Sequence, residues 1–483
     1  MMERLRTGNT QLDRILGGGI PMGSLVVLAG APGTGKTILA QQVCFSNGTP
    51  ENRAIYYTTL SEPHSKMVRH LEGFDFFDRS KLGVTVELNH LSTLAQEGDL
   101  ATAVAEVVRH SFDVSPSVVV IDSTKALHEA MEHAEHFRAI VYDLASRIAH
   151  TNSVLIFVGE YSLADVATAP EFAVADSIVY MSNESEGVLD QRLLRVLKLR
   201  GSDYLSGTHT FTIEPKGLAV YPRQESNIVR SAPAGEKRVA TGVPGLDEML
   251  GGGIPETSVT LVAGPSGGGK TVVGMHFVAE GLRHGDRCVY VSLQESEAQL
   301  VAKAQAFGWN FRDAIEKGTL VVRHFEPVEL SLDKVAVEIT ELVEGGARRV
   351  VIDSMGELEH AAHGAARFPD FLWALMSGLR TRGATVLVTS ETAAFFGPAF
   401  ELARGLSFVV DNVILLRYTE LESEIRRALT VVKMRESDHV KSLVEFEIGG
   451  KGASVKGKFT GMAGVLTGTP VRTEEKFREF FNR

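Results

Sequence analysis

The glycine-rich sequence GAPGTGKT at residues 30–37 returns as GPSGGGKT at residues 264–271. Both copies fit the pattern G-x-x-x-x-G-K-[ST], in which a loop between a strand and a helix holds nucleotide phosphates. Each copy directly follows an apolar run, SLVVLAG or SVTLVAG, that is typical of a buried strand. A strand, a phosphate-binding loop and a helix are therefore expected twice in this chain, which favours an α/β architecture.

The chemistry of each loop follows from its residue types. Glycines allow the backbone to approach an anion with several N–H groups pointing inward, and the next helix adds its positive N-terminal end. Lys36 and Lys270 are expected to reach the β- and γ-phosphates, and the hydroxyls of Thr37 and Thr271 to hold Mg²⁺. The sequence thus predicts two sites for ATP with Mg²⁺. The expected nucleotide-binding residues are Gly30, Ala31, Pro32, Gly33, Thr34, Gly35, Lys36 and Thr37, and Gly264, Pro265, Ser266, Gly267, Gly268, Gly269, Lys270 and Thr271.

The loops belong to a longer repeat, because the sequence around them also returns. TGNTQLDRILGGGIPMGS at residues 7–24 matches TGVPGLDEMLGGGIPETS at residues 241–258, YYTTLSEP pairs with VYVSLQES, and VLKLRGSD pairs with VVKMRESD. Lys36 and Lys270 are 234 positions apart, which is the length of a domain and too long for a solenoid unit. We predict two homologous domains, each a mostly parallel sheet with helices on both faces. The predicted parts are domain 1 at 1–222, a linker at 223–237, domain 2 at 238–466 and a C-terminal tail at 467–483.

Charge and cysteine content narrow the class of protein. The net charge of −11 argues against broad electrostatic binding to nucleic acid, although a local basic channel is compatible with it. Cys44 and Cys288 stand in different repeats, so we expect reduced cysteines packed in or near the core. The N-terminal sequence MMERLRTGNT has no apolar targeting segment, and no apolar run is long enough to cross a bilayer. We expect a soluble, cytoplasmic protein with no membrane partner.

Acidic residues stand where an ATPase needs them. Asp122 closes the apolar run SVVVID and Asp353 closes RRVVID, so both are expected to hold the metal at a strand end. The simpler interpretation is an aspartate that caps the next helix. Glu62 and Glu295 follow the next strand after each loop and helix, where a carboxylate can orient or deprotonate the attacking water. Their simpler interpretation is a glutamate favoured by the dipole at a helix start.

Together these residues make the chain resemble the KaiC-like branch of the RecA-type ATPases, whose cyanobacterial member is a clock protein. The resemblance covers nearly the whole chain. It rests on the doubled TG…LD…LGGGIP box, on Asp122 and Asp353, on the KLRGS and KMRES segments, and on the closing FTGMAGVLTGTP. It implies two RecA-like domains stacked as a double ring, usually of six protomers, with ATP held between neighbours. In the clock protein the first domain is the steady ATPase and the second phosphorylates itself.

The resemblance also gives a role to two basic pairs on strand-like segments. Their i, i+2 spacing places both side chains on one side of a strand. From there they are expected to reach the γ-phosphate of the neighbouring protomer, as an arginine finger does. Without the resemblance, a solvated basic strand edge is the preferred interpretation. Glu160 and Glu391 end another strand in each repeat and are weaker candidates to face the site. The two basic pairs are Lys198 with Arg200, and Lys433 with Arg435.

One departure from the family pattern concerns catalysis. Well-studied relatives carry a Glu-Glu pair, of which the first Glu is the favoured base. Here the pairs are Ser61-Glu62 and Gln294-Glu295, so only the second carboxylate remains in each. Either hydrolysis is slow, or Glu62 and Glu295 act alone.

A second departure concerns phosphorylation. The adjacent Ser-Thr acceptors of the clock protein align with Ser407 and Phe408, so serine is kept and threonine is lost. A two-site cycle is excluded at that pair, whereas phosphorylation of Ser407 alone is not. The simpler interpretation of Ser407 is a plain serine at the start of a buried strand. Phe172 takes the matching place in the first repeat, so only the second domain is expected to carry an acceptor.

Three functions fit the sequence. The first, which we expect, is a signalling ATPase whose nucleotide state, with or without phosphorylation of Ser407, is recognised by a partner protein. The second is a RecA-type DNA-dependent ATPase, against which stand the acidic charge and the absence of an obvious basic loop interleaved with aromatics. The third is a scaffold that ATP assembles and whose catalysis is vestigial, which the missing first glutamates favour.

Overall fold

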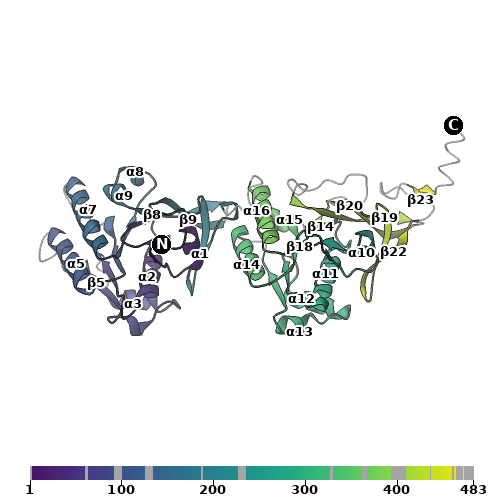
Figure 1. Cartoon of the computed structure of the whole chain (residues 1–483), viewed down its shortest axis with the longest axis horizontal. Helices are drawn as coiled ribbons and strands as arrows, with labels where there is room; N and C mark the ends of the chain where they lie inside the picture. Colours follow the sequence, from purple (N-terminus) through teal and green to yellow (C-terminus); the bar gives the residue numbers. More distant parts are fainter. Residues whose placement is uncertain are drawn as a thin grey trace. The chain divides into compact units, whose positions relative to one another are not determined.

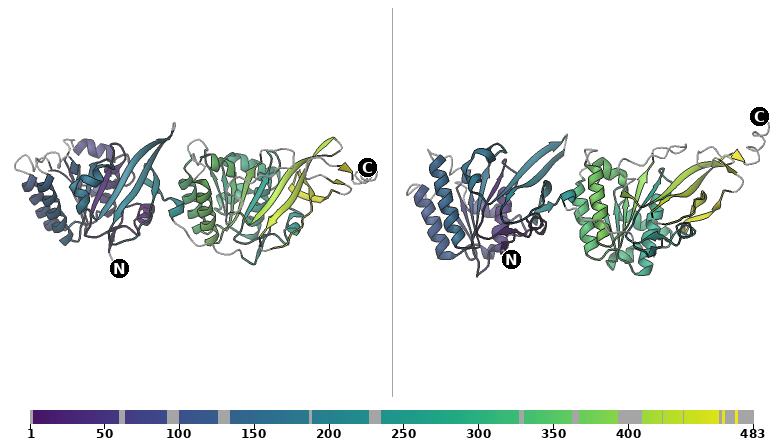
Figure 2. Two further views of the ribbon diagram at one scale, coloured as in Figure 1. Left: turned by 90° about the horizontal axis from the view of Figure 1, so that it is seen from above. Right: turned by 45° about the horizontal axis from the view of Figure 1, so that its top comes forward.

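The chain is seen in a computed structural model that divides into two compact units, Met1–Ser226 and Asn227–Arg483, called unit 1 and unit 2 below. Each unit is built on its own nine-stranded sheet with helices on both faces (Figures 1 and 2). The predicted mostly parallel α/β fold is thereby confirmed for both halves. The structure describes residues 3–59, 64–91, 100–125, 134–186, 189–226, 235–326, 330–361, 367–392, 409–421, 423–435, 437–459, 462–463 and 471–472.

The sheet of unit 1 combines a parallel part with an antiparallel extension. From β8 through β3, β7, β6 and β4 to β5 the neighbouring strands run parallel, whereas β9, β10 and β11 are joined antiparallel. The central parallel strands β3, β6 and β7 are short runs rich in Val, Ile and Leu because both of their faces are buried. In spatial order the strands are β11 (Gly217–Tyr221), β10 (Thr208–Glu214), β9 (Leu189–Leu199), β8 (Ser177–Glu186), β3 (Leu25–Gly30), β7 (Val154–Glu160), β6 (Val118–Asp122), β4 (Ala54–Thr58) and β5 (Val86–His90).

Two hydrophobic cores join the helices of unit 1 to this sheet. One contains α1 (Thr10–Ile15), α2 (Lys36–Asn47) and α3 (His64–Leu71). The other contains α5 (Leu100–Val114) and α7 (Ala134–His150), which cover the opposite face. The smaller elements are β1 (Arg4–Leu5) paired with β2 (Ile20–Pro21), η1 (Arg79–Lys81), α8 (Asp165–Thr168), α9 (Pro170–Val174) and η2 (Gln224–Ser226).

Unit 2 repeats this arrangement. In spatial order its strands are β16 (Leu320–His324), β15 (Cys288–Ser292), β17 (Arg349–Asp353), β18 (Thr385–Glu391), β14 (Val259–Gly264), β19 (Asn412–Leu421), β20 (Glu424–Met434), β21 (Val444–Gly449) and β22 (Gly452–Lys458). One face carries α14 (Leu332–Glu344), α15 (Met355–Ala361) and α16 (Phe368–Thr381). The other carries α10 (Leu246–Met249), α11 (Lys270–His284), α12 (Glu297–Ala306) and α13 (Phe311–Glu316). Two short pairs complete the unit, β12 (Arg238–Val239) with β13 (Ile254–Pro255) and β23 (Met462–Ala463) with β24 (Val471–Arg472).

The doubled TG…LD box has a structural role. The backbone N–H and the hydroxyl of Thr7 both donate to Oδ1 of Asp13 at 2.8 Å, and Thr241 binds Asp247 in the same way at 2.7 and 2.8 Å. Each aspartate therefore closes the turn that leads into α1 or α10. The box fixes the segment before the first strand of the parallel sheet and does not line a nucleotide cleft.

The segment predicted as the linker is tied to unit 1 at its start. The backbone N–H of Arg223 donates to Nδ1 of His209 at 2.9 Å. At the other end, the N–H of Gly235 donates to the carbonyl of Glu256 at 2.8 Å. The domain limits themselves stay a prediction.

Two simpler expectations concern cysteines and the membrane. Cys44 and Cys288 are free and buried, as expected, and burial raises the pKa of the Cys288 thiol to about 12. Within the described part of the chain, no helix combines the length and the apolarity that a membrane crossing requires.

Candidate nucleotide-binding sites

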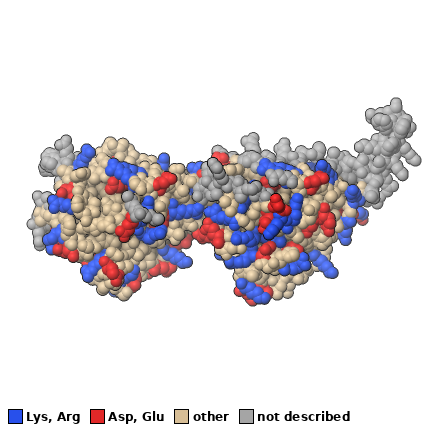
Figure 3. Space-filling view, viewed as in Figure 1, with Lys and Arg blue, Asp and Glu red and all other residues tan. Residues whose placement is uncertain are grey.

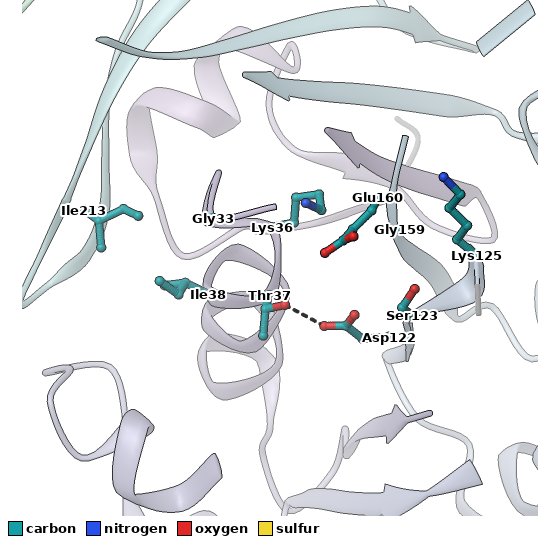
Figure 4. Close-up of a pocket in the computed structure, with 11 residues that line it drawn as sticks. Gly33, Lys36, Thr37, Ile38, Asp122, Ser123, Lys125, Gly159, Glu160 and Ile213 are labelled. Atoms are coloured by element: carbon teal, nitrogen blue, oxygen red, sulfur yellow. Dashed lines mark hydrogen bonds between the residues drawn. The ribbon is translucent and has the colours of Figure 1, made fainter. Parts of the chain in front are cut away.

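The site of unit 1 forms where the parallel strands end. Gly30 on β3 is in register with Glu160 on β7, and Thr58 on β4 is in register with Asp122 on β6. Because the strands are parallel, their carboxyl ends meet at one edge of the sheet, where ligands of open α/β sheets bind. A cleft of about 450 Å³ lies there (Figure 4).

The phosphate-binding loop of unit 1 needs glycine for backbone reasons. Gly33 and Gly35 have φ values of 75° and 91°, and a Cβ on Gly33 would meet no atom within 4 Å. Gly33 is therefore required by its left-handed conformation and leaves the loop open to a ligand. Gly35 is the N-cap of α2, so the helix starts at Lys36 and points its N-terminus into the cleft.

Lys36 lies folded back over this loop. Its ammonium donates to the carbonyl of Ala31 at 2.7 Å and lies 3.4 Å from Oγ1 of Thr34. Burial lowers the pKa of Lys36, and the nearby carboxylates of Glu160 and Asp122 oppose that shift. A buried ammonium held only by such partners is suited to bind an entering phosphate.

Asp122 is the centre of the polar contacts in this cleft. Its Oδ2 accepts a hydrogen bond from the hydroxyl of Thr37 at 2.7 Å, drawn in Figure 4, and another from Tyr56 at 2.6 Å. Burial raises the pKa of Asp122, whereas the bonds from Tyr56 and Thr37 oppose the rise. The carboxylate faces the loop, which supports the metal interpretation over that of a helix cap.

Unit 2 has the same arrangement around Asp353. Its Oδ2 accepts from the hydroxyls of Thr271 and Tyr290, each at 2.8 Å, and its Oδ1 accepts from Thr389. The ammonium of Lys270 donates to the carbonyls of Gly264 at 3.0 Å and Pro265 at 2.9 Å. The cleft around these residues measures about 250 Å³.

The oxygen atoms that meet in each cleft fit a magnesium ion. Mg²⁺ prefers oxygen ligands and is usually held by one or two protein groups together with substrate phosphates and waters. A threonine hydroxyl and an aspartate oxygen less than 3 Å apart supply that set in both units. Among the described residues, no group of three or more His, Cys, Asp or Glu forms a metal cage elsewhere.

The candidate catalytic glutamates differ in what the structure shows. Glu295 lines the cleft of unit 2, where its Oε1 is ion-paired with Lys303 and its Oε2 is buried without a hydrogen-bond partner. It directly precedes Ser296, the N-cap of α12, so the simpler interpretation of a glutamate at a helix start also fits its position. Glu62 lies outside the described residues, as does Ser407. Glu160 and Glu391 line the clefts of their units.

The basic pairs lie near the amino ends of the parallel strands, whereas the clefts lie at their carboxyl ends. Lys198 on β9 is in register with Ile178 at the start of β8, and β8 starts beside the amino end of β3. The ammonium of Lys433 donates to the carbonyl of Val410 at 2.8 Å, before β19 begins. β9 and β20 each lie between two other strands, but their pairing with β10 and β21 covers only Arg192–Arg195 and Arg427–Leu429. The ends that carry Lys198 and Lys433 are therefore paired on one side only. No pair is beside the loop of its own unit. Arg200 and Arg435 follow the same strands, and their side chains are 62% and 49% exposed.

Sequence reasoning missed several residues of these sites. In the sequence, Tyr56 and Tyr290 look like ordinary core residues of a strand, although a tyrosine in this strand of both repeats was a signal. When YYTTLSEP is aligned with VYVSLQES without a gap, Tyr57 stands opposite Tyr290. In the structure, however, Thr58 is in register with Asp122 and Ser292 is in register with Asp353. Thr58 therefore corresponds to Ser292, and Tyr56 corresponds to Tyr290. The other missed residues are Lys125 and Ile213 in unit 1 and Lys303 and Ile448 in unit 2.

A phosphate-binding loop whose threonine meets a strand-end aspartate, on a mostly parallel sheet repeated in tandem, defines RecA-like P-loop ATPases. A family model described as "ATPase: KaiC" matches residues 5–225 and 239–459, so the chain belongs to the KaiC family of ATPases. Circadian clock protein KaiC3 of Synechocystis sp. is 29% identical over 488 residues, covering 98% of this chain and 96% of the relative. Circadian clock oscillator protein KaiC of Acaryochloris marina is 29% identical over 473 residues, covering 95% and 90%.

Proposed function

We propose that this KaiC-family ATPase binds and hydrolyses Mg-ATP in both units and forms a double ring of six protomers whose nucleotide state is recognised by a signalling partner. One observation carries the proposal: in each unit the loop threonine and the strand-end aspartate lie 2.7–2.8 Å apart beside a folded-back lysine. The relatives are named as circadian clock proteins, which supports a signalling role.

Each residue then has a defined task. Thr37 with Asp122, and Thr271 with Asp353, would hold Mg²⁺, which neutralises phosphate charge when bound. Lys36 and Lys270 exchange their loop carbonyls for phosphate oxygens. The expected bases, which orient water and accept its proton, are Glu62 and Glu295.

The basic pairs support assembly. They lie at the amino edge of their own sheets, while the loops lie at the carboxyl edge, so they are poorly placed for their own nucleotide. In a ring they would meet the phosphates of the neighbouring protomer and neutralise charge that develops there. ATP at such a boundary couples nucleotide occupancy to assembly by mass action.

Unit 2 is also proposed to phosphorylate Ser407. Its cleft is lined by Lys270 and Thr271 of the loop, by Asp353 and by Glu295, and only this repeat carries a serine at the acceptor place.

On the face drawn in Figure 3, Lys and Arg are interspersed with Asp and Glu over each unit, and no continuous basic surface is visible among the described residues. That pattern disfavours the DNA-dependent ATPase.

The test combines nucleotide binding, turnover and mass measurement. Lys36→Ala and Lys270→Ala should each remove Mg-ATP binding from one unit only, so either single variant should keep about half the bound nucleotide. Loss of all binding in one single variant would contradict two independent sites. After incubation with Mg-ATP, intact mass and site mapping should show one phosphate on Ser407, absent from Lys270→Ala. An unmodified chain that releases ADP would leave an ATPase without the kinase, and no ADP release would leave the ATP-assembled scaffold.

A further inference from the structure

The cleft of unit 1 contains a second lysine that the P-loop pattern does not include. Lys125 follows β6 and lines the same cleft as Lys36 and Thr37. In Figure 4 the cleft runs from Ile213 and Ile38 at one end to Lys125 at the other, with Lys36 and Thr37 between them. The apolar end suits the nucleoside and the charged end suits the last phosphate, so Lys125 stands at the phosphate end.

The ammonium of Lys125 is held above an aromatic ring. Its Nζ lies 5.7 Å from the centroid of the Tyr161 ring, which is within the range of a cation–π interaction. That ring is itself fixed, because it is 3% exposed, its hydroxyl donates to Glu171 on α9, and it packs edge-on against Phe172 at 5.0 Å. The lysine therefore has a defined resting place at the cleft.

Within the described part of the chain, no carboxylate forms an ion pair with the ammonium of Lys125. The nearby Asp165 is half-buried and accepts hydrogen bonds from the backbone N–H of Ser162 at 2.7 Å and from its hydroxyl at 2.9 Å. Glu160 lines the same cleft and faces Lys36 as well. A phosphate entering the cleft would thus meet two lysines.

Unit 2 has neither the lysine nor the tyrosine at the corresponding positions. Gly356 follows Asp353 at the spacing at which Lys125 follows Asp122, and Thr392 follows Glu391 where unit 1 has the tyrosine. The next residue of unit 2 is Glu357, which accepts hydrogen bonds from Gln294 and from Ser354 beside the cleft. Unit 2 therefore has no charge at the place of Lys125, and the second lysine of its cleft, Lys303, is ion-paired with Glu295.

We propose that Lys125 is a specificity-determining residue that contacts the terminal phosphate of ATP in unit 1, so that unit 1 discriminates ATP from ADP more strongly than unit 2. The proposal rests on the proposed function, because it requires that both loops bind nucleotides. A charge-assisted hydrogen bond from an ammonium is among the stronger polar contacts, and ADP lacks the phosphate that would accept it.

The test measures affinity at one site at a time. In a Lys270→Ala background, which leaves the site of unit 1, Kd is measured for Mg-ATP and for Mg-ADP by calorimetry. Lys125→Ala should weaken Mg-ATP binding by about tenfold and change Mg-ADP binding by less than about twofold. Lys125→Arg should keep most of the preference, since it keeps the charge. Lys216→Ala removes an exposed lysine that does not line the cleft and is the matched control.

The outcomes separate this inference from the proposed function. Equal weakening of ATP and ADP binding by Lys125→Ala would show a general electrostatic or structural effect. Unchanged Kd values for both nucleotides would show that Lys125 does not contact the terminal phosphate. Either result overturns the inference and leaves the ATPase proposal standing. If the Lys270→Ala parent binds neither nucleotide while its thermal unfolding is normal, the site of unit 1 is not functional and both proposals fall.

Discussion

The hydroxyl of Tyr56 lies 2.6 Å from Oδ2 of Asp122, and Tyr290 stands 2.8 Å from the corresponding oxygen of Asp353. Both tyrosines are 1% exposed, and each comes from the strand next to that of its aspartate. Since the same aspartate oxygen also accepts from the loop threonine, the tyrosine fixes the orientation of the carboxylate that we propose to hold Mg²⁺.

Tyr56→Phe should therefore weaken Mg-ATP binding in unit 1 more than it weakens binding of ATP without Mg²⁺. It should also lower the free energy of unfolding of unit 1 by about 1–2 kcal/mol, because a buried carboxylate loses a hydrogen bond. Chemical denaturation and nucleotide titration with and without Mg²⁺ measure both effects.

The control for Tyr56→Phe is the adjacent strand residue. The hydroxyl of Tyr57 points to the other face of the sheet, where it is 2.8 Å from Nδ1 of His110. Tyr57→Phe should reduce stability without changing the dependence of binding on Mg²⁺. If both variants change that dependence equally, Tyr56 does not position the aspartate.

The fold and the main residues of the site were predictable because the repeat fixes them twice. The positions of Lys36, Thr37 and Asp122 follow from a strand, a loop and a second strand whose parallel register brings their ends together. The order of the strands in the sheet and the antiparallel extension were not predicted. The sequence pattern indicates where strands occur along the chain, but it does not indicate which strands pair. The roles assigned to these residues remain proposals.

Other parts of the site were hidden for physical reasons. Tyr56 was missed because a tyrosine in an apolar strand is ordinarily a core residue, and its polar contact depends on a strand far away in sequence. Lys125 was missed because it is present in one repeat only, so comparison of the repeats gave it no weight. The pairing of Glu295 with Lys303 joins a loop to the helix that follows, and nothing in the pattern indicates which helix residue turns back.

The ion pair between Lys303 and Glu295 makes a prediction about turnover. The ammonium of Lys303 is ion-paired with Oε1 of Glu295, one of the two oxygens that would accept a proton from water. In a Lys36→Ala background, which leaves only the site of unit 2, Lys303→Ala should raise the kcat for ATP hydrolysis by about threefold. Glu295→Gln in the same background should abolish it.

A matched variant tests whether this effect is specific. Lys317 forms an exposed ion pair with Asp313 on the same unit, at 2.7 Å, and does not line the cleft. Lys317→Ala should leave kcat unchanged. A fall in turnover with a parallel rise in KM after Lys303→Ala would instead assign Lys303 to phosphate binding.

Mixing protomers tests the proposed contact between neighbours. One protomer carries Lys198→Ala and Arg200→Ala and another carries Lys36→Ala, and both carry Lys270→Ala so that only unit 1 can turn over. Each alone should be inactive, whereas an equal mixture should recover about a quarter of the sites, because that share of ring boundaries joins an intact loop to an intact basic pair. No recovery, in mixtures shown to exchange protomers, would place the basic pair outside the active site.

A buried histidine in unit 2 adds a dependence on pH that the matching position of unit 1 does not supply. His276 on α11 accepts a hydrogen bond from the backbone N–H of Ala453 at 2.8 Å. In unit 1 the corresponding residue is Gln42, whose amide accepts from the N–H of Leu218 at 3.0 Å and donates to the carbonyl of Gly8 at 3.1 Å. Both side chains bridge their helix to the last strand of the sheet by accepting a backbone N–H, but only the histidine titrates.

Burial lowers the pKa of His276 from 6.5 to about 4. The unfolded chain therefore binds this proton more tightly than the folded chain does, so its contribution to stability is present above pH 6.5 and is lost as the pH falls towards 4. Between pH 7.5 and pH 5 the loss amounts to about 2 kcal/mol. His276→Gln, which copies unit 1, should remove that part of the pH dependence while keeping the bridge.

Tryptophan fluorescence measures this effect in unit 2 alone. Trp309 and Trp373 both lie in unit 2 and are the only tryptophans of the chain, and the Trp309 ring is 4.5 Å from the His276 ring. Urea denaturation followed by this signal at pH 7.5 and pH 5 should give a drop in the free energy of unfolding that is smaller by about 2 kcal/mol in His276→Gln than in the parent. Because every carboxylate is shared by the two proteins, their other contributions cancel in the comparison. An identical drop in both would mean that His276 is protonated at the same pH in the folded and unfolded chains, and that its burial does not set its charge.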